Sequence, residues 1–227
     1  MLSFERGKNM NDLSIDALVN KDNRLDLNYV PSDLVEFDNN ENNFHGFLDP
    51  NTRVTVSNKI LLPFRKLEEA SISDGLHISI DSGYRSASYQ EGVFNRFLAK
   101  YTNDIKKIYP NLSDEELYIL AYKKTCERVA LPGCSEHQTG YAFDIACYKN
   151  GVFSSSTSDD ERGWMKENSY KFGFILRYPK GKEEITGFNF EPWHFRYVGN
   201  DLAQELYNDG DYITLEEYHK VYTLIKK

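Results

Sequence analysis

The stretch LPGCSEHQTGYAFDI, residues 131–145, contains the pattern around which we expect the rest of the chain to be organised. Within it Ser135, His137 and Asp144 follow the spacing Ser-x-His-x-x-Gly-x-Ala-x-Asp, which places an imidazole and a carboxylate seven positions apart across a glycine. Imidazole nitrogen and carboxylate oxygen are common zinc ligands, and a catalytic zinc takes about three ligands from the protein. The stretch therefore predicts part of a metal site whose remaining ligand comes from elsewhere in the chain.

Two further stretches supply the residues that such a site needs. FNFEPWHFRYVG, residues 188–199, contains His194 as the candidate third ligand and Glu191 three positions before it. A glutamate close to a zinc-bound water can take the proton of that water and pass it on. DSGYRSASYQ, residues 81–90, places Arg85 directly after an apolar strand pattern. A guanidinium in such a place can stabilise the oxyanion that forms when a carbonyl is attacked.

Together these three stretches resemble the zinc D-alanyl-D-alanine peptidases of the VanY, VanX and VanXY type, a family associated with vancomycin resistance. Ser-x-His-x-x-Gly-x-Ala-x-Asp is complete, Glu-Pro-Trp-His is intact, and Ser-Gly-Tyr-Arg-Ser precedes both in the expected order. The resemblance extends from about residue 18 to residue 199 and begins with LVNKDNRLDLNYVPSDLV, which looks like the first segment of the carboxypeptidase branch. It implies a zinc site with His137, Asp144 and His194 as ligands.

The resemblance also implies a reaction and roles for four further side chains. Glu191 would be the general base, and Arg85 would polarise the substrate carbonyl. Ser135 would bind the terminal carboxylate of the substrate, and Gln90 would help to line the pocket. The implied substrate is a peptidoglycan precursor peptide that ends in D-alanine, the dipeptide D-Ala-D-Ala, or both. Two alternatives stay open. One is an L,D-carboxypeptidase acting on a stem tetrapeptide. The other is a non-catalytic module that binds wall peptides or zinc, and the intact Glu191 and Arg85 are evidence against this second alternative.

Length and charge limit the domain organisation and the partners. At 227 residues the chain is long enough for one well-buried core. We expect a single peptidase domain over residues 17–227, preceded by a loose, polar and aperiodic arm over residues 1–16. The net charge of −8 would repel nucleic acid and anionic membranes at long range, so neither is an expected partner.

The number of cysteines and the lack of long apolar runs indicate in which cellular compartment we expect the protein. The three cysteines, an odd number in a chain of this size, do not form a disulfide framework. No N-terminal stretch combines a basic region with an apolar run, and no segment approaches the roughly 20 apolar residues that span a bilayer. We therefore expect a soluble, cytoplasmic protein. The alternative is an extracellular protein from which an N-terminal anchor has been removed.

Apolar periodicity and capping pairs predict an α+β fold with a small, largely antiparallel sheet flanked by helices and the zinc site in the cleft. Capping boxes start three of the predicted helices, for example Ser113 with Glu116 and Ser158 with Glu161. The expected helices span 57–73, 86–101, 113–130, 158–173 and 201–207, with one more from 214. The expected strands span 76–82, 141–148, 174–178 and 185–199, and a long surface loop follows Pro31.

Each candidate residue also has an ordinary structural explanation. A single histidine in an apolar strand, such as His194, is more often a hydrogen-bonded core residue than a ligand, and Arg85 could equally be an ion-pair partner. Asp144 lies between two apolar strand residues, where an unpaired carboxylate would be costly to bury, so a metal is the simplest partner. Glu191 and His194 would point to opposite faces of a regular strand, and they share a site only if the strand is interrupted, as Pro192 permits.

Two other kinds of site receive less support. Cys134 and His137 have the Cys-x-x-His spacing of a structural zinc site with sulfur ligands, but no second pair of such ligands follows at a suitable distance. The Gly-x-Ser-x-Gly elbow of an α/β serine hydrolase is absent from the sequence. The choice between dipeptide and longer peptide depends on how loops such as 31–56 or 148–160 close over the site, and the sequence does not determine it.

Overall fold

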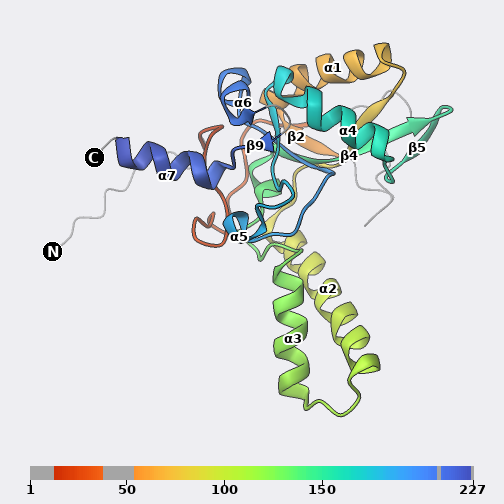
Figure 1. The fold of residues 1–227 in the computed structure, drawn as a ribbon, viewed down its shortest axis with the longest axis vertical. Helices are drawn as coiled ribbons and strands as arrows, with labels where there is room; N and C mark the ends of the chain where they lie inside the picture. The colour runs from red at the N-terminus through yellow and green to blue at the C-terminus, as the bar shows by residue number, and fades with distance from the viewer. Residues whose placement is uncertain (1–12, 38–53, 209–210, 226–227) are drawn as a thin grey trace.

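The computed structural model describes residues 13–37, 54–208 and 211–225 of the chain. Its centre is an antiparallel sheet in the order β3-β4-β7-β6, with β5 paired to β4. The predicted α+β fold with a small antiparallel sheet flanked by helices is confirmed (Figure 1). The strands of this sheet are β3 (Ile78–Ser82), β4 (Ala142–Lys149), β5 (Val152–Ser154), β6 (Phe174–Leu176) and β7 (His194–Tyr197).

The helices and the two smaller sheets complete the described part of the fold. Two two-stranded sheets pair β1 (Leu34–Glu36) with β2 (Thr55–Ser57) and β8 (Tyr207–Asn208) with β9 (Asp211–Tyr212). None of the helices in the described residues has the length and apolar character needed to cross a membrane. The helices are α1 (Asn58–Ser73), α2 (Ala87–Ile108), α3 (Asp114–Cys126), α4 (Asp159–Asn168), α5 (Glu183–Thr186), α6 (Asn200–Leu206) and α7 (Leu215–Ile225), with short 3₁₀ turns η1 (Glu136–Thr139) and η2 (Ser169–Phe172).

The two central strands β4 and β7 separate the core from the candidate site. Phe143 of β4 is paired with Phe195 of β7, and both side chains are fully buried. The ring of Phe143 packs edge-to-face against Phe64 of α1 at a centroid distance of 5.1 Å, so this face of the sheet lies on the core. Successive strand residues point to opposite faces. Asp144 and its paired residue His194 therefore lie on the other face, side by side.

Helices α2 and α3 form a hairpin that projects from the rest of the molecule (Figure 1). The two helices pack on each other through a small cluster of their own, which contains Tyr101, Ile105, Leu117 and Ala121. The prediction that the first of these helices ends at residue 101 is wrong, because α2 continues to Ile108. The apolar stripe continues through Ile105, and the helix stops just before Pro110, where the preceding residue is disfavoured in the helical conformation.

Other differences from the predicted elements concern boundaries and one strand. The segment 185–199 is not a single strand, since it begins within α5 and only His194–Tyr197 pairs in the sheet. The predicted helix over 113–130 ends at Cys126, and the one over 158–173 is split into α4 and η2. Gly173 ends the latter in the left-handed conformation, as expected for a helix C-terminus. Strands β1 and β2 were not predicted.

The N-terminal segment already contacts the rest of the domain at residues that precede the first strand in the sequence. The part of the expected loose arm that the structure describes, residues 13–16, contacts the sheet region through backbone oxygens. Tyr141 Oη donates to Leu13 O at 2.9 Å, and Arg196 Nη2 donates to Ile15 O at 2.9 Å. Residues 1–12 of that arm, and residues 38–53 of the expected surface loop, lie outside the described residues.

Candidate metal centre and active site

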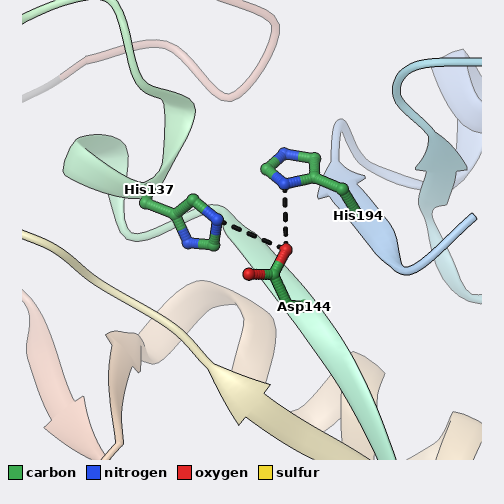
Figure 2. Close-up of side chains that lie close together, drawn as sticks. All are labelled: His137, Asp144 and His194. Atoms are coloured by element: carbon green, nitrogen blue, oxygen red, sulfur yellow. Dashed lines mark hydrogen bonds and ion pairs between the residues drawn. The ribbon is translucent and has the colours of Figure 1, made fainter. Parts of the chain in front are cut away.

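The structure brings together the three predicted zinc ligands from separate parts of the chain. His137 comes from the turn η1, Asp144 from β4 and His194 from the start of β7, and one ligand atom of each lies within 4.8 Å of the others. Asp144 Oδ1 is 3.4 Å from His137 Nε2 and 3.1 Å from His194 Nδ1 (Figure 2). Two imidazole nitrogens and a carboxylate oxygen thus face one point, which is the donor set of a catalytic zinc site.

A tight backbone turn places His137. Gly140 follows η1 with φ of 72°, in the left-handed region where a side chain is strained. A Cβ at this position would also lie 3.1 Å from Ser57 N, which donates a 2.9 Å hydrogen bond to Gly140 O. The glycine in the sequence motif is therefore required by the close approach of Ser57, the last residue of β2, whose hydrogen bond holds the turn that carries His137.

The hydrogen bond of one ring nitrogen of His137 determines which of its two nitrogens is free to bind a metal. Nδ1–H of His137 donates to Gly83 O at 2.7 Å, because a carbonyl oxygen can only accept. This bond leaves the Nε2 lone pair directed at the site, as is usual for histidines that bind metals. Burial, together with the nearby Arg85 guanidinium, lowers the pKa of His137 to about 4. The ring is therefore neutral at physiological pH, which is the form that coordinates zinc.

Asp144 is held from the opposite side by Arg85. Its Oδ2 accepts a 2.6 Å hydrogen bond from Arg85 Nη2, and Arg85 Nε donates to Ser82 Oγ at 2.9 Å. Burial alone would raise the pKa of Asp144, but His137 and Arg85 lower it well below the ordinary value. Asp144 is thus ionised, with Oδ1 left to face the two histidines. Together with the two imidazoles, this anionic oxygen makes the donor set fit a divalent zinc ion.

Glu191 lies beside this group and outside the regular strand. Its Oε2 is 4.0 Å from His194 Nδ1, and the residue is 8% exposed. A turn through Pro192 separates the two residues, closed by a 3.1 Å hydrogen bond from His194 N to Glu191 O. The interruption between Glu191 and His194 that the pleat required is therefore present. Burial, reinforced by the charge of Asp144, raises the pKa of Glu191 to about 8, so the site favours its protonated form.

A cavity of about 590 Å³ contains all seven predicted site residues in its wall. Ser135 and Gln90, the two expected substrate-binding residues, both line it. Gln90 Nε2 donates to Ala130 O at 2.8 Å, while its Oε1 is buried and has no hydrogen-bond partner among the described residues. Gln90 is therefore anchored to the backbone of Ala130 at the cavity wall. Apolar and aromatic side chains form much of the remaining wall, among them Tyr89, Val93, Phe97, Tyr178, Phe188 and Trp193.

Three polar residues near the site were not identified from the sequence. Asp81 lines the cavity, and burial together with Asp144 raises its pKa to about 6. Its position at the start of DSGYRS was a signal that could have been used. Arg128 also lines the cavity, with its guanidinium 5.6 Å from the ring of Trp193, but it belongs to no motif. Glu136 is fully buried next to His137 inside the motif. From the sequence alone, a glutamate in this loop suggests an exposed side chain, so its buried position was not expected.

Comparison with known proteins agrees with this geometry. The family model described as VanY, D-alanyl-D-alanine carboxypeptidase, matches residues 53–200. The chain belongs to the VanY D-alanyl-D-alanine carboxypeptidase family. The protein YodJ of Bacillus subtilis (strain 168) is 37% identical over 216 residues, which cover 92% of this chain and 68% of YodJ. The D-alanyl-D-alanine carboxypeptidase of Enterococcus faecalis (strain ATCC 700802 / V583) is 39% identical over 67% of this chain, which spans about half (51%) of that protein's length.

Solved structures that are similar to this chain share its fold. VanYB in complex with D-alanine-D-alanine has a TM-score of 0.71 at 33% identity, covering 90% of this chain and 97% of that one. A VanY variant from the VanB-type resistance cassette, solved in complex with Zn(II), has a TM-score of 0.69 at 33% identity, covering 90% and 98%. The LD-carboxypeptidase LdcB has a TM-score of 0.69 at 34% identity, covering 91% and 86%. The family predicted from the three sequence stretches is thereby confirmed.

Proposed function

We propose that this chain is a zinc peptidase that releases C-terminal D-alanine from peptidoglycan precursor peptides and also splits D-Ala-D-Ala. The observation that carries the proposal is the group of His137, Asp144 and His194 with the buried Glu191 beside it, all in the wall of one cavity. Membership of the VanY family supports it, as does the likeness to VanYB, which was solved with D-alanine-D-alanine. We further propose that residues 17–227 act as one peptidase domain.

The zinc ion would be held by His137 Nε2, Asp144 Oδ1 and His194 Nδ1, the three atoms that face one another. When bound, zinc supplies Lewis acidity that polarises a carbonyl oxygen and makes water more acidic. The related VanY structure in complex with Zn(II) supports this choice of metal. The protein would contribute one carboxylate oxygen and two imidazole nitrogens, and the hydrogen bond from His137 Nδ1 to Gly83 O orients the first of the two rings.

Glu191 would be the general base and then the general acid. Its carboxylate accepts a proton from the attacking water and returns that proton to the amine of the departing D-alanine. Burial favours protonated Glu191, whereas a divalent cation on the neighbouring ligands favours the ionised form. These two effects bring the pKa of Glu191 toward neutrality, where a proton can be both taken and returned. The wall of apolar side chains excludes water that would otherwise compete for these contacts.

Arg85 would have two roles, because its guanidinium group carries several N–H donors. Nη2 and Nε hold Asp144 and Ser82. Within the described residues Nη1 has no hydrogen-bond partner, so it remains available to stabilise negative charge on the substrate oxygen. Ser135 Oγ can donate to the terminal carboxylate of the substrate, and Gln90 would help to line the pocket.

The second candidate function is an L,D-carboxypeptidase that removes D-alanine from a stem tetrapeptide. The likeness to LdcB, with nearly the same TM-score and identity as the VanY structures, favours it as the alternative. The two candidates share the metal, the base and the released amino acid. They differ in the residue before the scissile bond, which has the D configuration in one substrate and the L configuration in the other.

The test is to incubate the purified zinc-loaded protein with D-Ala-D-Ala, a pentapeptide precursor and a tetrapeptide, and to follow released D-alanine. We expect release from the pentapeptide and the dipeptide, and a loss of about 10²–10⁴-fold in rate for Glu191→Gln with zinc still bound. Release from the tetrapeptide alone would select the second candidate. Release from none of the three would refute both and favour a binding module.

A further inference from the structure

Two buried polar atoms behind the metal group face each other without a hydrogen bond. His194 Nε2 and Glu136 Oε2 are both inaccessible to solvent and have no hydrogen-bond partner in the part of the chain that the structure describes, and they lie 4.0 Å apart. Buried polar groups nearly always have a hydrogen-bond partner, so two unpaired groups this close together require a physical explanation. His194 Nε2 is the ring nitrogen that does not face Asp144, and Glu136 therefore lies behind a candidate ligand.

The other oxygen of Glu136 is fully engaged by two arginines. Glu136 Oε1 accepts a 2.8 Å hydrogen bond from Arg177 Nε, and Arg196 Nη1 forms an ion pair with the same oxygen at 2.9 Å. All three side chains have an exposed fraction of 0%. The arginines therefore hold the carboxylate in one orientation, in which Oε2 is directed to His194.

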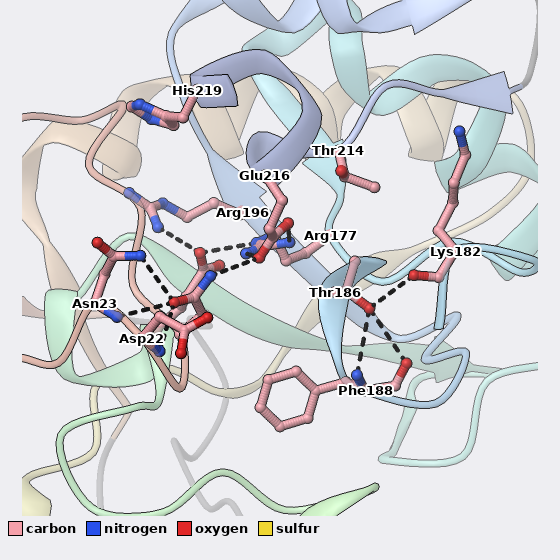
Figure 3. Close-up of polar contacts among 12 residues, drawn as sticks. Asp22, Asn23, Arg177, Lys182, Thr186, Phe188, Arg196, Thr214, Glu216 and His219 are labelled. Carbon is pink, nitrogen blue, oxygen red and sulfur yellow. Dashed lines mark hydrogen bonds and ion pairs between the residues drawn. The ribbon is translucent and has the colours of Figure 1, made fainter. Parts of the chain in front are cut away.

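The ion pairs continue to the C-terminal helix and balance the buried charges. Arg177 Nη1 and Nη2 donate to the two oxygens of Glu216 on α7 at 2.9 and 2.7 Å, as Figure 3 shows for the labelled pair. Two arginines thus meet two glutamates. Burial alone would raise the pKa of Glu136, but Arg177 and Arg196 outweigh it and lower that pKa, so Glu136 is an anion.

We propose that Glu136 is a positioning residue for zinc: its Oε2 accepts the Nε2–H of His194 and thereby directs the Nδ1 lone pair of His194 at the metal. This inference rests on the proposed role of His194 as a ligand. A metal on Nδ1 requires the ring proton to be on Nε2, and a carboxylate that accepts this proton fixes the tautomer and makes the ring a stronger donor. The open 4.0 Å pair is the position where that hydrogen bond forms.

Glu136→Gln is a sharp test because the arginines dictate how the new amide sits. Both Arg177 and Arg196 present donors, so the amide oxygen must face them and the amide NH₂ must face His194. A donor then meets the Nε2–H of His194. Glu216→Gln is the matched control, since it removes one charge from the same ion-pair network without changing what faces His194.

The experiment measures zinc affinity of the full chain by competition with a chelator of known affinity, without any peptide substrate. We expect Glu136→Gln to weaken zinc binding by about 10–100-fold and Glu216→Gln to leave it within about 2-fold of the original. Equal losses in both variants would show that Glu136 acts only as part of the ion-pair network and would overturn the proposal. Unchanged affinity in Glu136→Gln would overturn it as well.

A measurement on the unaltered protein covers the case in which Glu136→Gln does not fold. Long-range ¹H–¹⁵N NMR of the zinc-loaded chain distinguishes metal-bound from protonated ring nitrogens. We expect His194 to carry its proton on Nε2, with the resonance shifted downfield and slow to exchange with water. Zinc on Nε2, or a rapidly exchanging Nε2 proton, would refute the proposal. Because neither readout involves a substrate, a protein that binds zinc in this way but cleaves no D-alanine peptide would overturn the proposed function alone.

Discussion

Glu191→Gln should remove a pH dependence of stability that burial of the carboxylate creates in the metal-free protein. Glu191 is 8% exposed, and its pKa is raised from 4.5 to about 8. Between these two values the folded chain keeps the proton that the unfolded chain has released. The free energy of unfolding therefore falls as the pH rises through this window. Glutamine has no proton to lose, so the variant lacks this contribution.

The magnitude follows from the two pKa values. Each pH unit in the window is worth about 1.4 kcal/mol, so the interval from pH 5 to pH 8 corresponds to about 4 kcal/mol at most. Relative to the unaltered chain, Glu191→Gln should therefore gain several kcal/mol in free energy of unfolding on going from pH 5 to pH 8. Other groups titrate over the same range, but they are common to both proteins and cancel in the comparison.

The assay is urea unfolding of both proteins at pH 5 and pH 8 in the presence of a chelator, followed by circular dichroism. The solvent-exposed Glu91→Gln controls for loss of a surface carboxylate. Adding zinc should shrink the pH dependence, because the cation favours ionised Glu191. If the stability difference between Glu191→Gln and the unaltered chain is the same at pH 5 and pH 8, then the carboxylate is not held in its protonated form and the reasoning is wrong.

Three further predictions follow from the contacts of the site. Arg85→Lys should lower kcat more than it raises KM, because one ammonium cannot hold Asp144 and also stabilise the oxyanion; a lower melting temperature with unchanged kcat of the folded fraction would assign Arg85 a structural role. His137→Ala and His194→Ala should each abolish one-to-one zinc binding, and full zinc content in both by metal analysis would contradict the ligand assignment. Gly140→Ala should cost about 1–3 kcal/mol in urea unfolding because of its φ of 72°, and an unchanged midpoint would show that the turn adapts.

The residues that the sequence predicted for the site lie together in the structure, and they could be recognised because the residues of each motif are close together in the chain. The spacing from His137 to Asp144 requires only a glycine turn and one strand, and both are local features. The alternation in β4 placed Asp144 opposite the apolar core residues, and the cost of burying a lone carboxylate there pointed to a metal. The capping box of Ser113 with Glu116, which starts α3, was likewise recognisable from two residues.

Boundaries and long segments were less predictable, because tertiary contacts override local preference. The segment 185–199 contains alternating apolar residues, yet only the four residues from His194 to Tyr197 find a partner strand in β4 and β6. Helix α2 extends to Ile108 because α3 packs against it and buries Ile105. A strand or a helix ends where the element that packs against it ends, and a single sequence does not show which element that is.

The sequence alone determined which residue types stand at the spacings of a zinc peptidase, since donor chemistry belongs to the side chains themselves. Only the tertiary structure decided how those side chains are used. It aligned Asp144 with His194 across two strands, turned Glu191 into the site through Pro192, and engaged Arg85 with Asp144. It also buried Glu136 between two arginines that lie 41 or more positions away in the chain. Such contacts depend on burial and on through-space distance, which the order of residues does not contain.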